Sequence, residues 1–177
     1  MASSEHINLD AIADAPASFA FELPLSVAGL EREPLVAISP VRLEGTVSPI
    51  EGGFRMEARC AFESRLECSR CLAPYPSDVD ETFTLLLYPR GSAGQAGGDQ
   101  ADVVEFDGRE IAVAPIAEER VQLSIPMKPL CGRECQGLCP QCGADRNAGP
   151  CGCAEPMADP RWSALESFKN AAKTQKA

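Results

Sequence analysis

Nine cysteines are the residues of this 177-residue chain best suited to chemistry, and eight of them occur at spacings typical of metal ligands. One pair forms a Cys-x-x-Cys turn in the middle of the chain, and six more cysteines fall within twenty-three residues farther on. The eight residues are Cys68, Cys71, Cys131, Cys135, Cys139, Cys142, Cys151 and Cys153. Such turns place two thiolates on one side of a tight loop, where both can bind one tetrahedral ion. We therefore predict a structural zinc site made only of cysteine sulfur.

The number of ions and the pairing of the ligands stay open at the level of sequence. One tetrahedral zinc accepts four thiolates, so eight cysteines predict one or two ions. The strongest pair is Cys139 and Cys142, because Gly143 frees backbone amides to donate hydrogen bonds to the sulfurs. Two other pairs can complete its site: Cys151 with Cys153, or Cys68 with Cys71.

Cysteine pairs can also cycle between dithiol and disulfide, so a thiol oxidoreductase is an alternative. That chemistry usually needs the first cysteine at a helix N-terminus, whereas Cys68 ends a predicted strand and no helical pattern follows Cys71. Catalytic zinc needs an open coordination position and often a carboxylate base, for which Glu134 and Asp145 are candidates only by proximity in sequence. All-cysteine ligation favours a structural site, so we expect no enzyme and name no catalytic residue.

The ninth cysteine, Cys60, has a different setting. It lies among apolar residues of one parity in a predicted strand, which indicates an inert buried thiol. The N-terminal residues carry neither a basic segment nor an apolar run of signal-peptide length, and no apolar run reaches the eighteen or so residues of a membrane span. We expect a cytoplasmic protein without a membrane partner, in which clustered cysteines bind metal and do not form disulfides.

The net charge of −10 is unevenly distributed along the chain. Residues 1–125 hold nine Lys/Arg against twenty-one Asp/Glu, giving −12, and residues 126–177 hold seven against five, giving +2. Phosphate would be repelled by the acidic part, so the cysteine-rich end is the candidate RNA-binding or ribosome-binding face. Lys128, Arg133 and Arg146 are its candidate RNA-binding residues. The alternative is that the charges form an ordinary solvated surface.

Alternating apolar residues predict strands around Phe19–Leu25, Val41–Val47, Phe54–Cys68 and Val79–Tyr88. A short helix is expected to start at Pro115 and to end before Pro126. The predicted fold is α+β: a mainly antiparallel β body with a short helix, a cysteine-rich zinc-binding tail and a C-terminal helix. In that last helix Trp162, Leu165 and Phe168 recur at helical spacing, which favours packing against the body over binding a partner.

We predict one domain over residues 1–177, divided into four parts. Residues 1–17 are a loose N-terminus, and residues 18–125 are the β-rich body, in which 90–102 form a flexible Gly/Ala/Ser-rich connector. Residues 126–158 are the cysteine-rich module, and 159–177 are the C-terminal helix. The module has too little apolar material to fold alone, so we expect metal binding to stabilise it.

Several of these motifs together resemble the bacterial YceD family of large ribosomal RNA subunit accumulation proteins. The resemblance rests on Leu66-Glu67-Cys68-Ser69-Arg70-Cys71-Leu72-Ala73-Pro74-Tyr75, on Leu123-Ser124-Ile125-Pro126-Met127-Lys128-Pro129-Leu130-Cys131, on Gly137-Leu138-Cys139-Pro140-Gln141-Cys142-Gly143 with Asn147, and on Asp159-Pro160-Arg161-Trp162-Ser163-Ala164-Leu165 with Phe168-Lys169. It covers roughly the last two-thirds of the chain. The combination is specific, whereas any one piece alone is weak.

The resemblance implies a non-enzymatic factor in the synthesis, processing or stability of large-subunit (23S) ribosomal RNA. It carries over no catalytic residue. Its partner would be this RNA or a pre-ribosomal particle, recognised through the zinc-stabilised module. The alternative partner is a basic ribosomal protein, bound by an adaptor that makes no direct RNA contact.

Overall fold

The computed structural model describes residues 6–12, 15–30, 33–92, 102–153 and 161. The chain divides into two compact units, residues 1–137 and 138–177, and each is described by itself. The sheets and helices described below belong to the first unit. The predicted cysteine-rich module, residues 126–158, has Cys131 and Cys135 in the first unit and its other four cysteines in the second.

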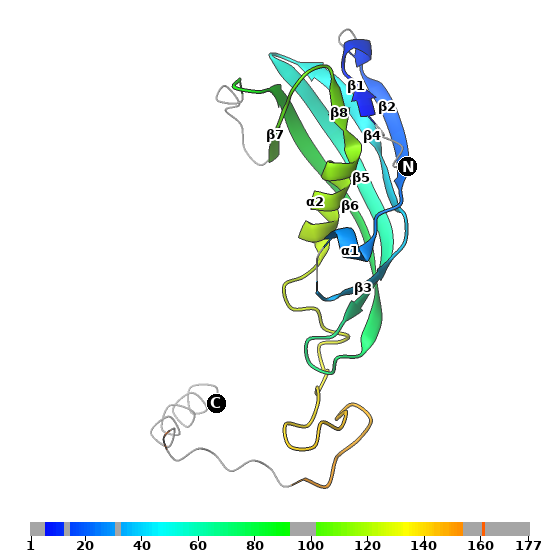
Figure 1. Cartoon of the computed structure of the whole chain (residues 1–177), viewed down its shortest axis with the longest axis vertical. Helices are drawn as coiled ribbons and strands as arrows, with labels where there is room; N and C mark the ends of the chain where they lie inside the picture. Colours follow the sequence, from blue (N-terminus) through cyan, green and yellow to red (C-terminus); the bar gives the residue numbers. More distant parts are fainter. Residues whose placement is uncertain (1–5, 13–14, 31–32, 93–101, 154–160, 162–177) are drawn as a thin grey trace, which may run out of the picture. The chain divides into compact units, whose positions relative to one another are not determined.

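The first unit is built on a six-stranded sheet with the order β2-β4-β5-β6-β7, in which β3 also pairs with β5 (Figure 1). Every pairing is antiparallel except that of β6 with β7, which is parallel. The strands are β2 (Ala17–Leu23), β3 (Leu35–Ile38), β4 (Val41–Ile50), β5 (Gly53–Glu67), β6 (Pro74–Pro89) and β7 (Asp102–Phe106). The prediction of an α+β fold with a mainly antiparallel sheet is confirmed.

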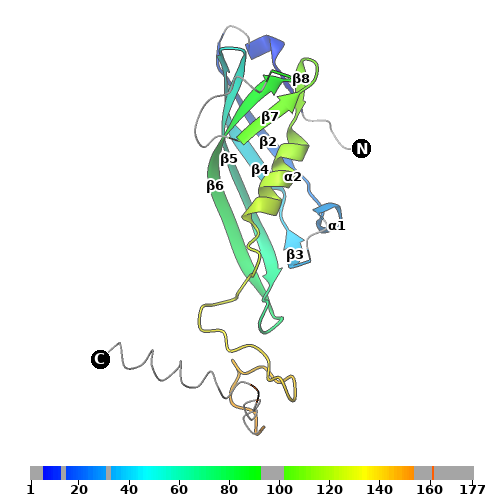
Figure 2. The ribbon, with the colours of Figure 1, turned by 90° about the vertical axis from the view of Figure 1, so that its left-hand side faces the viewer.

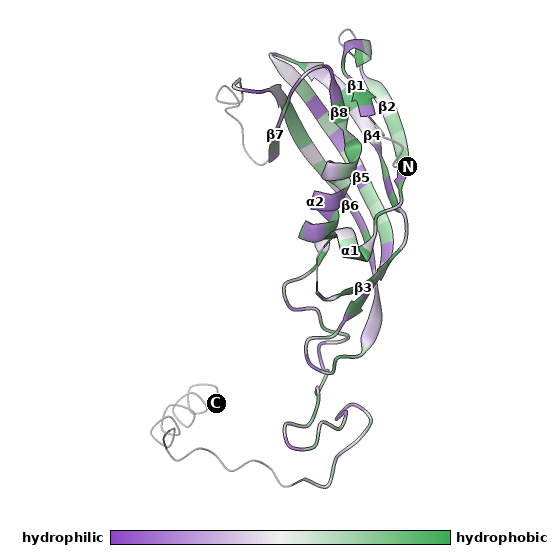
Figure 3. Cartoon of the chain, in the orientation of Figure 1, coloured by the Kyte–Doolittle hydropathy of each residue, from purple (hydrophilic) through white to green (hydrophobic). Residues whose placement is uncertain are grey.

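The long hairpin of β5 and β6 is the element that positions the first group of cysteines. Along β5, buried and exposed side chains alternate, as the period of two in its sequence predicts. Figure 3 shows the hydropathy of the residues along the strands. Ser64, the one polar residue on the buried face, donates its hydroxyl to the carbonyl of Ser77 at 2.6 Å. This hydrogen bond satisfies the buried hydroxyl, so the strand continues without a break to Glu67 and presents Cys68 at its end.

Strand β6 begins at Pro74, whereas the sequence predicted irregular structure from Leu72 to Pro76 and a strand only from Val79. The reason lies in the ladder. The Cys68 N–H donates to the carbonyl of Ala73 at 3.0 Å, so odd-numbered residues at the start of β6 bond to β5. Both prolines then fall at positions where no N–H toward β5 is needed, and β7 pairs only farther along the strand.

Helix α2 (Val113–Ser124) lies along one face of the sheet (Figure 1, Figure 2). It begins two residues before the predicted start, and Pro115 is tolerated because it falls in the first turn. Its apolar face completes the core with Val113, Ile116, Ala117 and Val121. The buried Arg120 reaches Asp102 of β7 with Nη2 at 2.8 Å and lies over the ring of Phe83 in β6 at 4.8 Å. These contacts fasten the helix to the outer strands of the sheet.

The N-terminal residues differ from the prediction of a loose segment over residues 1–17. Strand β1 (His6–Asn8) pairs with β8 (Glu110–Ala112), and the turn of 3₁₀-helix η1 (Asp10–Ile12) follows. Ile7, Leu9 and Ile12 are buried in the core. The apolar residues are too few to give a visible period, yet a partner strand far along the chain orders them.

Helix α1 (Val27–Leu30) precedes β3. The predicted C-terminal helix at 159–177, with its proposed packing, lies outside the described residues apart from residue 161, as does most of the predicted connector. The described ends of that connector are held in place, since Arg90 bonds Asp107 and the N–H of Gly91 donates to Glu105. In the described residues, no helix is both long and apolar enough to cross a membrane.

Candidate metal centres

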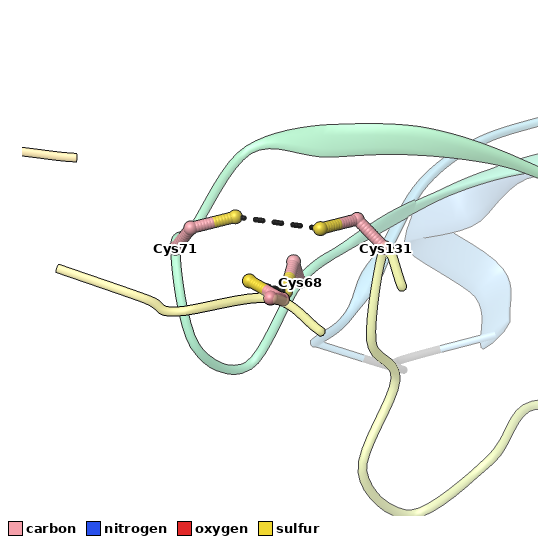
Figure 4. A group of neighbouring side chains, drawn as sticks. Cys68, Cys71 and Cys131 are labelled. Atoms are coloured by element: carbon pink, nitrogen blue, oxygen red, sulfur yellow. Dashed lines mark hydrogen bonds between the residues drawn. The ribbon is translucent and has the colours of Figure 1, made fainter. Parts of the chain in front are cut away.

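Four cysteines of the first unit, from two distant segments, come together at the tip of the β5–β6 hairpin. Cys68 and Cys71 come from the hairpin loop, and Cys131 comes from the segment that follows α2 (Figure 4). Cys135 comes from the same segment as Cys131. We call these four residues the first cluster. The Cys71 and Cys131 sulfurs are 3.7 Å apart, and those of Cys68 and Cys135 are 3.8 Å apart. Four sulfurs at about 2.3 Å from a tetrahedral ion lie about 3.8 Å from one another, so the spacing fits a zinc tetrathiolate.

Backbone hydrogen bonds shape the hairpin loop around Cys68. The N–H of Arg70 points to the Cys68 sulfur at 3.4 Å, and the N–H of Leu72 donates to the Cys68 carbonyl at 2.9 Å. The Ser69 N–H donates to the carbonyl of Pro129 at 2.8 Å, which ties the loop to the segment carrying the other two ligands. Backbone hydrogen bonds therefore position the two segments of the first cluster, in addition to the contacts between their sulfurs.

Arg70 makes a second tie between the two segments of the first cluster. Its Nη1 donates to the carbonyl of Cys135 at 2.7 Å and to the carbonyl of Arg133 at 3.3 Å. A tetrathiolate zinc site carries a net charge of −2, so a guanidinium beside it is electrostatically favourable. Arg70 was not among the predicted site residues, and its only signal in the sequence is its position between Cys68 and Cys71.

The second cluster consists of Cys139, Cys142, Cys151 and Cys153, all within one loop of the second unit. As in the first cluster, the four sulfurs lie within 4.8 Å of one another. Local backbone contacts stabilise the loop. The Cys139 N–H donates to the carbonyl of Ala144 at 2.8 Å, and Leu138 forms an isolated antiparallel β-bridge with Asp145. Asp145 accepts hydrogen bonds from the backbone and side chain of Asn147, so this carboxylate shapes a turn.

In each cluster one thiol has a lowered pKa and another has a raised pKa. Burial raises the pKa of Cys68, but the backbone N–H groups of Cys131, Cys71 and Arg70 outweigh it and bring the pKa to about 6. The neighbouring side chains, with Cys135 first, raise the pKa of Cys131 to about 12. Without a cation the thiols therefore cannot all ionise together, because each thiolate opposes the next.

In the second cluster the backbone N–H groups of Cys142 and Gln141 bring the pKa of Cys139 to about 6. The side chain of Cys142 is the main cause that raises the pKa of Cys153 to about 12. A divalent cation would remove this conflict, since a coordinating thiol is deprotonated outright. Both clusters could hold a metal ion, one in each, and the four soft sulfurs of each fit zinc.

The two Cys-x-x-Cys turns share one backbone geometry. In the first, Leu72 has φ 59° and donates to the carbonyl of Cys68, and in the second Gly143 has φ 71° and donates to the carbonyl of Cys139. A left-handed conformation costs an L-residue about 1–2 kcal/mol, whereas glycine adopts it freely. Leu72 is also 54% exposed, so its side chain contributes little packing.

We expect Leu72→Gly to raise the free energy of unfolding by up to about 1 kcal/mol, because it relieves the left-handed strain without removing a buried side chain. Gly143→Ala, at the equivalent position of the other turn, should lower the affinity of the second cluster for zinc by about fivefold. Urea denaturation checks the first effect and a competitive chelator titration checks the second. A lower free energy of unfolding in Leu72→Gly, or an unchanged zinc affinity in Gly143→Ala, would contradict the shared geometry.

The remaining predicted residues divide between the core and the surface. Cys60 is fully buried in β5, and burial raises its pKa to about 11, which confirms an unreactive core thiol apart from the clusters. Lys128 and Arg133 are exposed in the first unit, and Arg146 is exposed in the second. Each of these cations lies near cluster cysteines in the sequence. Their contact with RNA stays a prediction.

Comparison with known proteins gives the context of these clusters. Residues 56–169 match the family described as large ribosomal RNA subunit accumulation protein YceD. The chain is 30% identical over 123 residues to an uncharacterized protein of Mycobacterium tuberculosis, covering 70% of this chain and 59% of that protein. It is 26% identical over 138 residues to a chloroplastic large ribosomal RNA subunit accumulation protein, YCED homolog 1, of Zea mays. That match covers 62% of this chain and 46% of the maize protein.

The match to the family includes all eight cysteines of the two clusters. The chain spans about three-fifths of the length of the mycobacterial relatives, and less than half of the maize protein. No solved structure matches it.

Proposed function

Because the chain belongs to the YceD family of large ribosomal RNA subunit accumulation proteins, we propose that it supports the accumulation of large-subunit ribosomal RNA as a non-enzymatic recognition factor. It binds this RNA or a pre-ribosomal particle in the cytoplasm. Two structural zinc ions, one in each cysteine cluster, fix the backbone of the segments that make the contact. The metal itself takes no part in a reaction.

The observation that carries this proposal is the pair of four-cysteine clusters within the family match. Each cluster offers four sulfurs, which leaves a tetrahedral ion without the open position that catalysis needs. Their loops carry Lys128, Arg133 and Arg146, all exposed. These cations supply the phosphate contacts of the proposed RNA interface.

We expect the double change Arg133→Ala and Arg146→Ala to weaken binding of a large-subunit ribosomal RNA fragment by about tenfold at low salt. Each lost phosphate contact should reduce the slope of log K against log salt by about 0.7–0.9. A filter-binding titration at several salt concentrations measures both quantities. The matched control is Arg42→Ala with Arg65→Ala, two exposed arginines in β4 and β5 that form no ion pair with the described residues.

An equal loss of affinity in the control would point to general electrostatics, and an unchanged affinity in the first double variant would refute the assigned surface. The adaptor alternative is favoured by one observation, the −12 charge of residues 1–125, which suits a basic protein partner. In that case the chain itself makes no RNA contact, so the titration shows no specific RNA binding by the unmodified chain or by either double variant. A thiol oxidoreductase is the third alternative, and turnover of a dithiol substrate by metal-free protein would support it.

A further inference from the structure

The outer edge of β6 is uncovered over most of its length within the described residues. Residues 74–84 pair with β5 on one side, whereas β7 pairs on the other side only with residues 85–89. Figure 2 looks toward this side of the sheet and shows β6 continuing past the end of β7. An unpaired edge presents a row of backbone donors and acceptors, which is a template for an added strand.

The ladder determines which residues present these groups. Odd-numbered residues of β6 bond to β5, so the backbone groups of Asp78, Asp80 and Thr82 point outward. The described residues give their N–H groups no hydrogen-bond partner. Pro74 and Pro76 have the same orientation but lack an N–H, so they interrupt the edge near the hairpin tip. We call residues 78–82 the free edge.

The free edge is acidic on the face of the sheet opposite α2. Asp78 lies directly across from Glu63 of β5, and like charges in this position oppose each other. No described cation is within ion-pair distance of either carboxylate. A hollow of about 390 Å³ beside them is lined also by Glu22 and Asp80, and by one cation, Arg42, which forms no ion pair with Asp78 or Glu63. Asp80 is already neutralised by Arg59, which leaves Asp78 and Glu63 as the uncompensated pair.

The other face of the same strand carries Val79 and Phe83, with Glu81 between them. The side chains of Val79 and Phe83 are partly buried and pack against the core from its margin. Side chains alternate between faces along a strand, so a segment added at the free edge would bring every second residue beside these two. Its remaining residues would lie about 4.8 Å from Asp78 and Asp80, within reach of a lysine side chain.

We propose that the free edge binds an extended segment of a basic protein partner, in which Lys or Arg alternates with apolar residues. The backbone of the segment pairs with Asp78, Asp80 and Thr82, its cations meet Asp78 and Glu63, and its apolar residues cover Val79 and Phe83. The same acidic groups repel a second copy of this chain, whose net charge is −10. This inference goes beyond the proposed function, because it uses neither cysteine cluster.

The test uses the full chain with zinc and a fluorescein-labelled peptide of five Lys-Val repeats. Fluorescence anisotropy at low salt should show saturable binding, and hydrogen exchange should show slower exchange at the amides of Asp78, Asp80 and Thr82. Thr82→Pro removes one outward N–H and, like Pro74 and Pro76, none that bonds to β5, so it should weaken binding at least about tenfold. Thermal unfolding of this variant verifies that the sheet is intact.

Asp78→Lys provides a second arm that leaves the backbone unchanged. It should also weaken binding at least about tenfold, whereas Glu118→Lys on the exposed side of α2 makes the same charge change and should weaken it by less than about threefold. Equal losses from these two lysines, or full binding by Thr82→Pro, would overturn the proposal. Protection of the same amides by a 20-nucleotide RNA instead of the peptide would also overturn it. None of these outcomes tests the proposed RNA contacts of Arg133 and Arg146.

Discussion

Replacing Cys131 by serine is expected to lower the zinc content from two ions per chain to one and to destabilise the first unit by about 3 kcal/mol or more. The first cluster joins the hairpin loop to the segment after α2, and neither segment has a core of its own. Structural zinc in small modules contributes on the order of 10 kcal/mol to folding, so even a fraction of that energy is a large loss. Elemental analysis and urea denaturation measure the two effects.

Hydrogen exchange gives the same prediction a local readout. The amides of Ser69 and Leu72 donate to Pro129 and Cys68 across or within the first cluster, and both should exchange faster in Cys131→Ser. The control is Cys60→Ala, which removes a buried thiol outside the clusters, costs about 1 kcal/mol and leaves two ions bound. Two ions in Cys131→Ser, or none in the unmodified chain, would disprove the assignment.

Gly45→Ala should lower the free energy of unfolding by about 3 kcal/mol or more, although it adds a single methyl group. A Cβ at this position in β4 would lie 2.1 Å from the Glu57 carbonyl oxygen and 2.7 Å from the Ala58 Cα. Both atoms belong to the backbone of β5, so the collision can be relieved only by moving a central strand. The melting temperature should fall by about 10 °C.

Gly132→Ala is the matched control, because a Cβ there meets no atom within 4 Å and the residue does not need a positive φ. Its melting temperature should stay within about 2 °C of that of the unmodified chain. Differential scanning calorimetry of zinc-loaded protein compares the two variants. A similar small effect from both would mean that β4 and β5 are farther apart than described.

The features that local pattern encodes could be predicted from the sequence. The alternation in β5 identified a strand with one buried face, and it also separated Cys60 from the eight cysteines of the two clusters. Two Cys-x-x-Cys pairs and four further closely spaced cysteines identified the eight residues that gather into two clusters. In each of these cases the information lies within a few residues of the position concerned.

What the sequence could not supply depends on residues far apart in the chain. The grouping of Cys68 and Cys71 with Cys131 and Cys135 is set by the length of the β5–β6 hairpin and by where α2 ends. Residues 6–8 form a strand because they pair with β8, which lies about a hundred residues later in the chain. Likewise, two prolines in β6 are tolerated only because this part of the strand lies at an edge. Tertiary context decided each point against the local signal.

The ligands of the first cluster enclose the segment from Cys71 to Cys131, which contains β6, β7, β8 and α2. A nascent chain leaving the ribosome can therefore assemble this site only after the whole enclosed segment has been synthesised. The second cluster needs only the fifteen residues 139–153, which emerge together. Metal binding at the hairpin tip would therefore mark the completion of the first unit, and a chain that stalls before residue 135 could not form this site.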